Sequence, residues 1–291
     1  MGLRKMQEMP AEKLAAGQNE NGEQKEAAGL AAERGEADIA EAESLRLSVG
    51  YATAAAEEIS GDTAISSGLP DGSLALILSD GMGKGIMAAA ESRAVARRLR
   101  KNLKSGMKPA FAIKEVNRYM LDCEEALHQA GPARCSGAAA GEAECFATVD
   151  LLIIDRNAAK AKFYKMGAAS SFLLRNGKVK KFEQAALPIG IIPEIRLNHI
   201  AVRLKAGDIV VMVSDGITEA ARVNGELRLA GSNCADGSDG AWLHELLESR
   251  TAAELVHLSA RRLAGEILDE AVLRYADRER DDLTVAVVKI L

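Results

Sequence analysis

The chain has 291 residues, is 48% hydrophobic and carries a net charge of −5. That length can bury a sizeable core and exceeds what one compact unit usually needs, so we expect one large domain with an appendage. The acidic balance provides no basic surface for nucleic acid, and the longest apolar runs, Phe146–Ile154 and Ile209–Val213, are far shorter than the roughly 20 residues of a membrane span, so we expect a cytoplasmic chain without either partner.

Residues 1–44 are rich in Ala, Glu, Gln and Gly and almost lack large apolar side chains. Such a segment cannot cover a core, so it is predicted to be a flexible or partly helical tail or linker. The folded domain is predicted to start at Leu45 and to run to residue 291, because from there large and small side chains alternate.

The first half of this domain combines strands with two helices. DGSLALILSDG reads as a turn, a buried strand and Asp-Gly, and a helix is predicted to follow to about residue 104. Pro109 opens a second helix to about Gln129, followed by a small-residue loop over 131–141. The apolar stripe of the first helix is expected to face the core, and it consists of Ile86, Met87, Ala90, Ala94, Val95, Leu99 and Leu103.

The second half is rich in strands. They are predicted in CFATVDLLIID, KAKFYKMG, HIAVRL and GDIVVMVSDG, and in SSFLLRNGKVKKFE, where Asn176-Gly177 forms a hairpin turn. A polar loop over 222–240, helices over 241–249 and 252–274, and a final strand in DDLTVAVVKIL follow. Because strands and helices segregate, we predict an α+β domain of antiparallel sheets covered by helices.

The cysteines give no sign of a metal or disulfide site. Cys123, Cys135, Cys145 and Cys234 form no C-x-x-C pair and lie in or beside different predicted elements. Free thiols in a reducing compartment are expected, and a structural zinc is not.

Acidic residues mark the ends of three predicted strands. Asp80 and Asp215 each follow an apolar strand and precede glycine, and Asp281 begins the last strand. In an antiparallel sheet the start of one strand adjoins the end of its neighbour, so these acids can converge. Asp62, in SGD, is a fourth candidate. An isolated Asp-Gly is ordinary turn chemistry, but the set is a stronger signal.

Converging carboxylates repel one another unless a cation neutralises them. Oxygen ligands suit hard ions such as Mg²⁺ or Mn²⁺. Glycine after the acid lets the backbone bring its carbonyl oxygen close to an ion, which accounts for the pairing of Asp80 with Gly81. The sequence therefore predicts a carboxylate metal site.

Five motifs in this order resemble the metal-dependent, type 2C protein phosphatases, and within them the bacterial branch typified by stage II sporulation protein E. They are SGD (60–62), SDGMGKG (79–85), LPIGI (187–191), KAGDIVVMVSDGITE (205–219) and DDLTVAVV (281–288). The resemblance covers residue 45 to the C-terminus. It implies a four-layer sandwich, in which two antiparallel sheets are flanked by helix pairs, with two ions, usually manganese, at one edge.

The resemblance also implies roles for individual residues. Asp80 would bridge both ions, the Gly81 carbonyl would touch one, and Asp215 and Asp281 would hold the other. Asp62 matches the family's early acid, and Asp282 is expected to orient its neighbours or to add charge. The ions would activate water for direct attack on the phosphoryl group.

Two positions depart from eukaryotic relatives. Met82 stands where they carry a histidine proposed as general acid, and no arginine precedes Asp62 to clamp phosphate. Loss of a general acid typically costs 10²–10⁴-fold, so slower, regulated catalysis is expected. Met82 could equally be a packing residue.

The resemblance further implies a phosphorylated anti-anti-sigma factor as substrate and a role in sporulation-type sigma-factor control. It leaves open a homodimer, and also attachment to membrane helices elsewhere in a longer protein. Two other functions compete with this one. One is a catalytically weak, phosphatase-like binding module. The other is nucleotide binding by DGMGKG, which matches neither common glycine-rich phosphate loop and begins with an acid.

Overall fold

The computed structural model describes residues 44–130, 145–220, 222–223, 226–227, 240–275 and 280–291, with side chains omitted at 127–130 and in 222–227. The chain divides into two compact units, Met1–Glu33 and Arg34–Leu291, and all described residues belong to the second. The expected tail over 1–44 and the loop over 131–141 therefore lie, except for Ser44, outside the described residues. No helix within the described ranges is long and apolar enough to cross a membrane.

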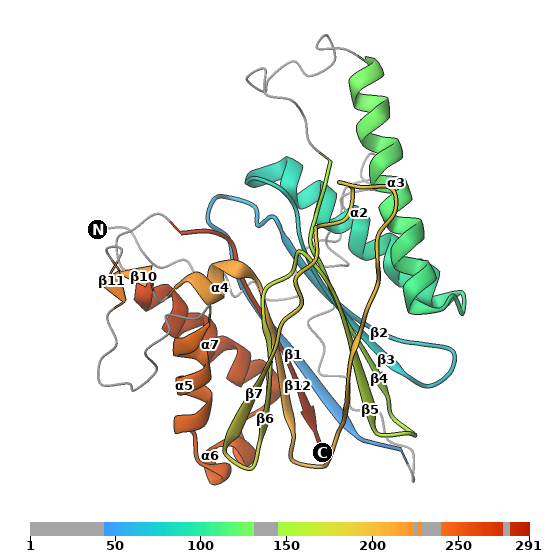
Figure 1. Cartoon of the computed structure of the whole chain (residues 1–291). Helices are drawn as coiled ribbons and strands as arrows, with labels where there is room; N and C mark the ends of the chain where they lie inside the picture. Colours follow the sequence, from blue (N-terminus) through green and yellow to red (C-terminus); the bar gives the residue numbers. More distant parts are fainter. Residues whose placement is uncertain (1–43, 131–144, 221, 224–225, 228–239, 276–279) are drawn as a thin grey trace, which may run out of the picture. The chain divides into compact units, whose positions relative to one another are not determined.

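Ten strands form two five-stranded sheets in which all neighbours are antiparallel (Figure 1). Sheet 1 has the order β1 (Leu47–Ala54), β12 (Leu283–Ile290), β9 (Ile209–Val213), β6 (Ser171–Arg175) and β7 (Lys178–Phe182). Sheet 2 has the order β2 (Asp62–Gly68), β3 (Leu74–Asp80), β4 (Val149–Asp155), β5 (Lys160–Met166) and β8 (Ile200–Arg203).

Alternation along the strands divides the core in two. In β9, Val210 and Met212 join β3 residues such as Leu76 in the cluster that lies between the sheets. Their neighbours Val211 and Val213 face the other way, into the cluster beneath the helices of sheet 1. Side chains of a strand point alternately to its two faces, so an unbroken apolar run is what a strand buried on both faces requires.

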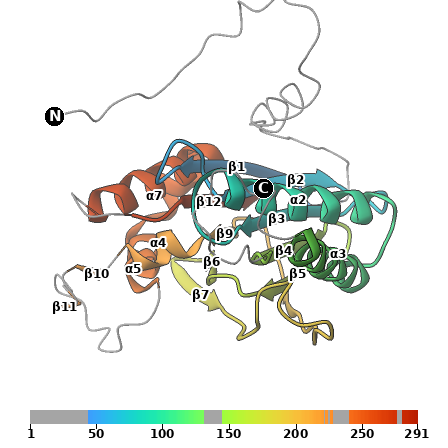
Figure 2. The same ribbon diagram turned by 90° about the horizontal axis from the view of Figure 1, so that it is seen from above.

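Helices cover the outer face of each sheet. Sheet 2 carries α2 (Gly85–Lys104) and α3 (Pro109–Ala130). Sheet 1 carries α4 (Asp215–Glu219), α5 (Ala241–Ser249), α6 (Ala252–His257) and α7 (Ala260–Tyr275), and Figure 2 shows the two groups on opposite sides of the strands. The predicted α+β four-layer sandwich is confirmed. Two short strands, β10 (Arg222–Val223) and β11 (Glu226–Leu227), pair within the expected polar loop.

Turn chemistry was predicted well where it is local. Asn176 and Gly177 join β6 to β7 and have φ angles of 50° and 71°. Positive φ at both positions is the signature of the tight hairpin turn that Asn-Gly favours.

Two helix predictions were wrong in part. The helix expected over 252–274 is two helices, because the backbone is extended at Leu258 and the Ser259 hydroxyl accepts the Arg262 N–H. The first turn of α2 is not core: Ile86 is 71% exposed and Met87 is 59% exposed. Packing against sheet 2 begins with small side chains at 88 and 89 instead.

Candidate metal centre

The predicted acids meet at one edge of the sandwich. The β2–β3 register places Asp62 directly opposite Asp80. In sheet 1, β9 runs antiparallel to β12, so Asp215 follows one strand where Asp281 precedes the other. A Cβ atom added to Gly216 would lie 3.3 Å from the Cβ of Asp281, which shows how closely these two segments approach.

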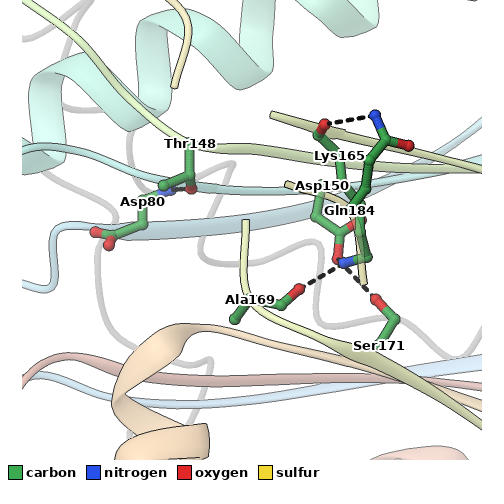
Figure 3. A network of polar contacts seen from close by, with 7 residues as sticks. All are labelled: Asp80, Thr148, Asp150, Lys165, Ala169, Ser171 and Gln184. Carbon is green, nitrogen blue, oxygen red and sulfur yellow. Dashed lines mark hydrogen bonds and ion pairs between the residues drawn. The ribbon is translucent and has the colours of Figure 1, made fainter. Parts of the chain in front are cut away.

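Hydrogen bonds fix the backbone at Asp80. The Thr148 hydroxyl accepts the Asp80 N–H at 2.9 Å, and the Asp80 carbonyl accepts the Thr148 N–H at 2.8 Å (Figure 3). The Ser79 hydroxyl donates to the Thr148 carbonyl at 2.7 Å. Thr148 was not singled out in the sequence, because only strand pairing brings it to Asp80.

The turn that carries Asp215 is anchored from two helices. Asp215 is exposed and begins α4. The Tyr275 hydroxyl donates to the Gly216 carbonyl at 2.7 Å, and the Trp242 indole N–H donates to the Ile217 carbonyl at 2.9 Å. Both aromatic side chains are buried, so they set the direction of the turn without reaching the centre.

Asp282 has a different role from its neighbour. Its buried carboxylate accepts the N–H groups of Ala56 at 2.7 Å and Gly61 at 2.6 Å. It thereby ties the segment before Asp62 to the start of β12. This geometry agrees with the expectation that Asp282 orients its neighbours. Asp281, in contrast, is half-buried. Among the hydrogen bonds described, it accepts only that of the adjacent Asp282 N–H, at 2.8 Å.

The electrostatics of the centre favour a bound cation. Burial, followed by the charges of Asp62, Asp215, Asp281 and Asp282, raises the pKa of Asp80 to about 9. Burial also raises the pKa of Asp62 to about 7, against the opposing effect of the Ser214 and Thr284 hydroxyls. Crowded carboxylates of this kind are stable as anions only beside a positive charge.

The donor set fits a hard divalent ion. Both carboxylate oxygens of Asp62 are buried, and neither accepts a hydrogen bond of ordinary geometry from the residues that the structure describes. Oxygen donors of this type are those that Mg²⁺ and Mn²⁺ prefer. In the part of the chain that the structure describes, no three His, Cys, Asp or Glu side chains close into one coordination shell, so the acids border the centre without enclosing it.

Met82, in the loop after Gly81, does not have the packing role that was considered for it. Met82 is 49% exposed, so it is not a core residue. Its N–H donates to Glu91 in α2 at 3.2 Å. Burial raises the pKa of Glu91 to about 7, and this N–H partly offsets the rise. Glu91 was missed in the sequence, because its position on an amphipathic helix gives no chemical signal.

The LPIGI motif lies beside the segment that follows Asp80. Gly81 pairs with Ala147, which in turn pairs with Ile189. Asn117 of α3 accepts the Gly190 N–H and donates to the Ile192 carbonyl, both at 2.9 Å. The motif is therefore joined to the segment after Asp80 through Ala147, and to α3 through Asn117.

Two five-stranded antiparallel sheets, helices outside them and an acidic edge together define the metal-dependent type 2C phosphatase fold. The phosphatase domain with part of the regulatory domain of SpoIIE from Bacillus subtilis superposes with a TM-score of 0.66 at 30% identity, covering 86% of this chain and 63% of that one. The separate phosphatase domain of SpoIIE gives 0.56 at 30% identity, covering 86% and 94%. RsbX in complex with magnesium gives 0.54 at 15% identity, covering 87% and 98%, and shows the fold alone.

The family model for stage II sporulation protein E (SpoIIE) matches residues 70–291, and the chain belongs to this family. Stage II sporulation protein E of Bacillus subtilis is 32% identical over 249 residues, which are 85% of this chain and 26% of that protein. The protein of that name from Priestia megaterium is 29% identical over 232 residues, 80% of this chain and 34% of that protein. The chain thus spans about a quarter to a third of the length of these relatives and carries the phosphatase domain of the family.

Proposed function

We propose that this chain is a metal-dependent serine/threonine phosphoprotein phosphatase. The observation that carries the proposal is the pairing of Asp62 with Asp80 across β2 and β3, within reach of the charges of Asp215 and Asp281. A fold that concentrates this much buried negative charge gains most from divalent cations.

Two ions, Mn²⁺ or Mg²⁺, would be bound by different residues of the centre. Asp80 and the Gly81 carbonyl would hold one, Asp215 and Asp281 the other, with Asp80 shared and Asp62 beside it. Bound ions supply an acidified water and neutralise charge on phosphoryl oxygens. Asp282 keeps the approach to Asp62 in place through its two N–H bonds, and Tyr275 keeps the turn after Asp215 in place.

Family membership supports a substrate of a particular kind. Because the relatives named above are sporulation proteins, a phosphorylated anti-anti-sigma factor is the substrate that we expect, within sporulation-type sigma-factor control. The net charge of −5 gives no general basic surplus of the kind that nucleic-acid-binding domains carry. We further propose a cytoplasmic location, a homodimer and a domain boundary near residue 44.

The test is hydrolysis of p-nitrophenyl phosphate and of a phosphoserine protein with Mn²⁺ and with EDTA. Asp80→Asn and Asp215→Asn should abolish the Mn²⁺-dependent rate. Asp71→Asn is the matched control, because Asp71 lies in the turn before β3, at the opposite end of that strand from Asp80. Wild-type protein no faster than Asp80→Asn would favour the weak binding module instead.

A further inference from the structure

A buried charged network lies behind Asp80, separate from the four acids. Lys165 and Asp150 face each other across β5 and β4, are 0% and 1% exposed, and form an ion pair at 2.5 Å. Lys165 also donates to the Ala169 carbonyl at 2.5 Å, and the Ser171 hydroxyl donates to Asp150 at 2.8 Å (Figure 3). Ser171 belongs to sheet 1, so the network joins the two sheets.

Stability alone does not account for this network. Desolvation of a buried ion pair often exceeds the attraction between its charges, and apolar replacements of similar volume are commonly neutral or stabilising. Asp150 is also incompletely satisfied: Oδ2 accepts from Lys165 and Ser171, whereas Oδ1 is buried and has no hydrogen-bond partner among the described residues. A buried acceptor in this state requires a donor.

A small cavity lined by Asp150 could hold such a donor. Its volume is about 10 Å³, close to the minimum for a single water molecule. Asp150 lines it together with Asp80, Thr148, Ser214 and Asp215. The cavity therefore connects the Lys165–Asp150 pair with two of the acids assigned to the metal centre and with the threonine that fixes the Asp80 backbone.

We propose that one water molecule fills this cavity and links Asp150 to the metal centre, so that Lys165 and Asp150 act as positioning residues for Asp80 and Asp215. The inference rests on the proposed function, because it assigns these residues to the same centre. The pair holds β4 against β5 and β6, and Thr148, which directly precedes β4 and lies two positions before Asp150, transmits that placement to Asp80. Substitution of residues that hold metal ligands in place typically lowers metal affinity by 10–100-fold.

Replacing the Lys165–Asp150 ion pair with apolar side chains distinguishes an effect on metal binding from an effect on stability. Lys165→Met alone should lower the melting temperature, because it leaves Asp150 buried without its cation. Asp150→Leu with Lys165→Met should restore the melting temperature but still weaken Mn²⁺ binding about tenfold or more, measured without substrate by calorimetry or by the spin resonance of free Mn²⁺.

Asp208→Asn is the control: Asp208 is buried and paired with Arg175, but precedes β9 at the end remote from Asp215. It should lower the melting temperature and leave Mn²⁺ affinity unchanged.

The outcomes distinguish the two proposals. A double variant that binds Mn²⁺ as wild type does, while wild type shows Mn²⁺-dependent turnover, overturns the positioning role and leaves the phosphatase proposal intact. Wild type that neither binds Mn²⁺ nor turns over substrate overturns both. A high-resolution crystal structure of wild type gives a test that needs no variant to fold: a water within hydrogen-bonding distance of Asp150 Oδ1 is expected, and an empty cavity contradicts the proposal.

Discussion

Burial of the acids, together with the repulsion among them, should make the metal-free protein less stable as pH rises. The pKa of Asp80 is raised from 3.8 to about 9 and that of Asp62 from 3.8 to about 7. Between pH 4 and 9 the folded state therefore binds more protons than the unfolded state, and the free energy of unfolding falls with increasing pH. Each pKa unit corresponds to about 1.4 kcal/mol, so a loss on the order of several kcal/mol by pH 8.5 is expected.

Asp80→Asn removes the carboxyl group whose ionisation is most strongly opposed by folding and should reverse much of this loss. In EDTA at pH 8.5 its melting temperature should exceed that of wild type by roughly 5–10 °C, given about 2–4 °C per kcal/mol for a domain of this size. At pH 5 the difference should be much smaller, because this pH lies only about one unit above the unfolded-state pKa of 3.8, so little of the loss has accumulated. Saturating Mn²⁺ should stabilise wild type and leave the variant unchanged.

The assay is a series of thermal melts from pH 5 to 8.5, in EDTA and in Mn²⁺, with Asp71→Asn as control. Asp71 has no place in the centre, so this variant should follow the wild-type pH dependence. A wild-type stability that is flat or rises with pH in EDTA, or an Asp80→Asn variant no more stable than wild type at pH 8.5, would refute the electrostatic reasoning.

Three further changes probe the support of the centre and of the fold. Thr148→Val loses the acceptor for the Asp80 N–H and should reduce Mn²⁺ affinity about tenfold with about 1 kcal/mol of destabilisation, read from Mn²⁺ titrations and denaturant curves. Gly190→Ala should destabilise by more than about 2 kcal/mol in the same curves, because φ is +96° and its Cβ would lie 2.3 Å from the Cys145 carbonyl oxygen. Lys289→Met removes the donor that satisfies carbonyls at the end of α6 and should lower the melting temperature without altering the Mn²⁺ requirement; a changed Mn²⁺ requirement would contradict its purely structural role.

Much of the fold could be predicted because its signals are local. The apolar runs of β3 and β9, the Asn176-Gly177 turn and the helix start at Pro109 each depend on a few adjacent residues. The acids at strand ends were also recognisable, since apolar runs that stop at Asp-Gly identify both the strand and its end. Antiparallel pairing then brought Asp62 to Asp80.

The contacts that were missed lie between distant segments. Asp282 was expected to orient its neighbours, but its partner Ala56 lies 226 positions earlier, and Thr148 meets Asp80 across 68 positions. Neither residue type is unusual where it stands, so nothing local marks it. The exposed first turn of α2 was misjudged for the same reason, because where Ile86 points depends on how far sheet 2 extends beneath it.

The position of β12 has a consequence for the order in which the molecule can form. This strand comes after all the other described elements in the chain, yet it lies between β1 and β9 within sheet 1. Until it is inserted, β1 lacks its neighbour, and the edges of β1 and β9 are open to pairing with other chains. Contacts this remote in sequence form slowly. During synthesis Asp80 and Asp215 are therefore made well before Asp281 can join them, so a nascent chain cannot bring these acids together before its sandwich closes.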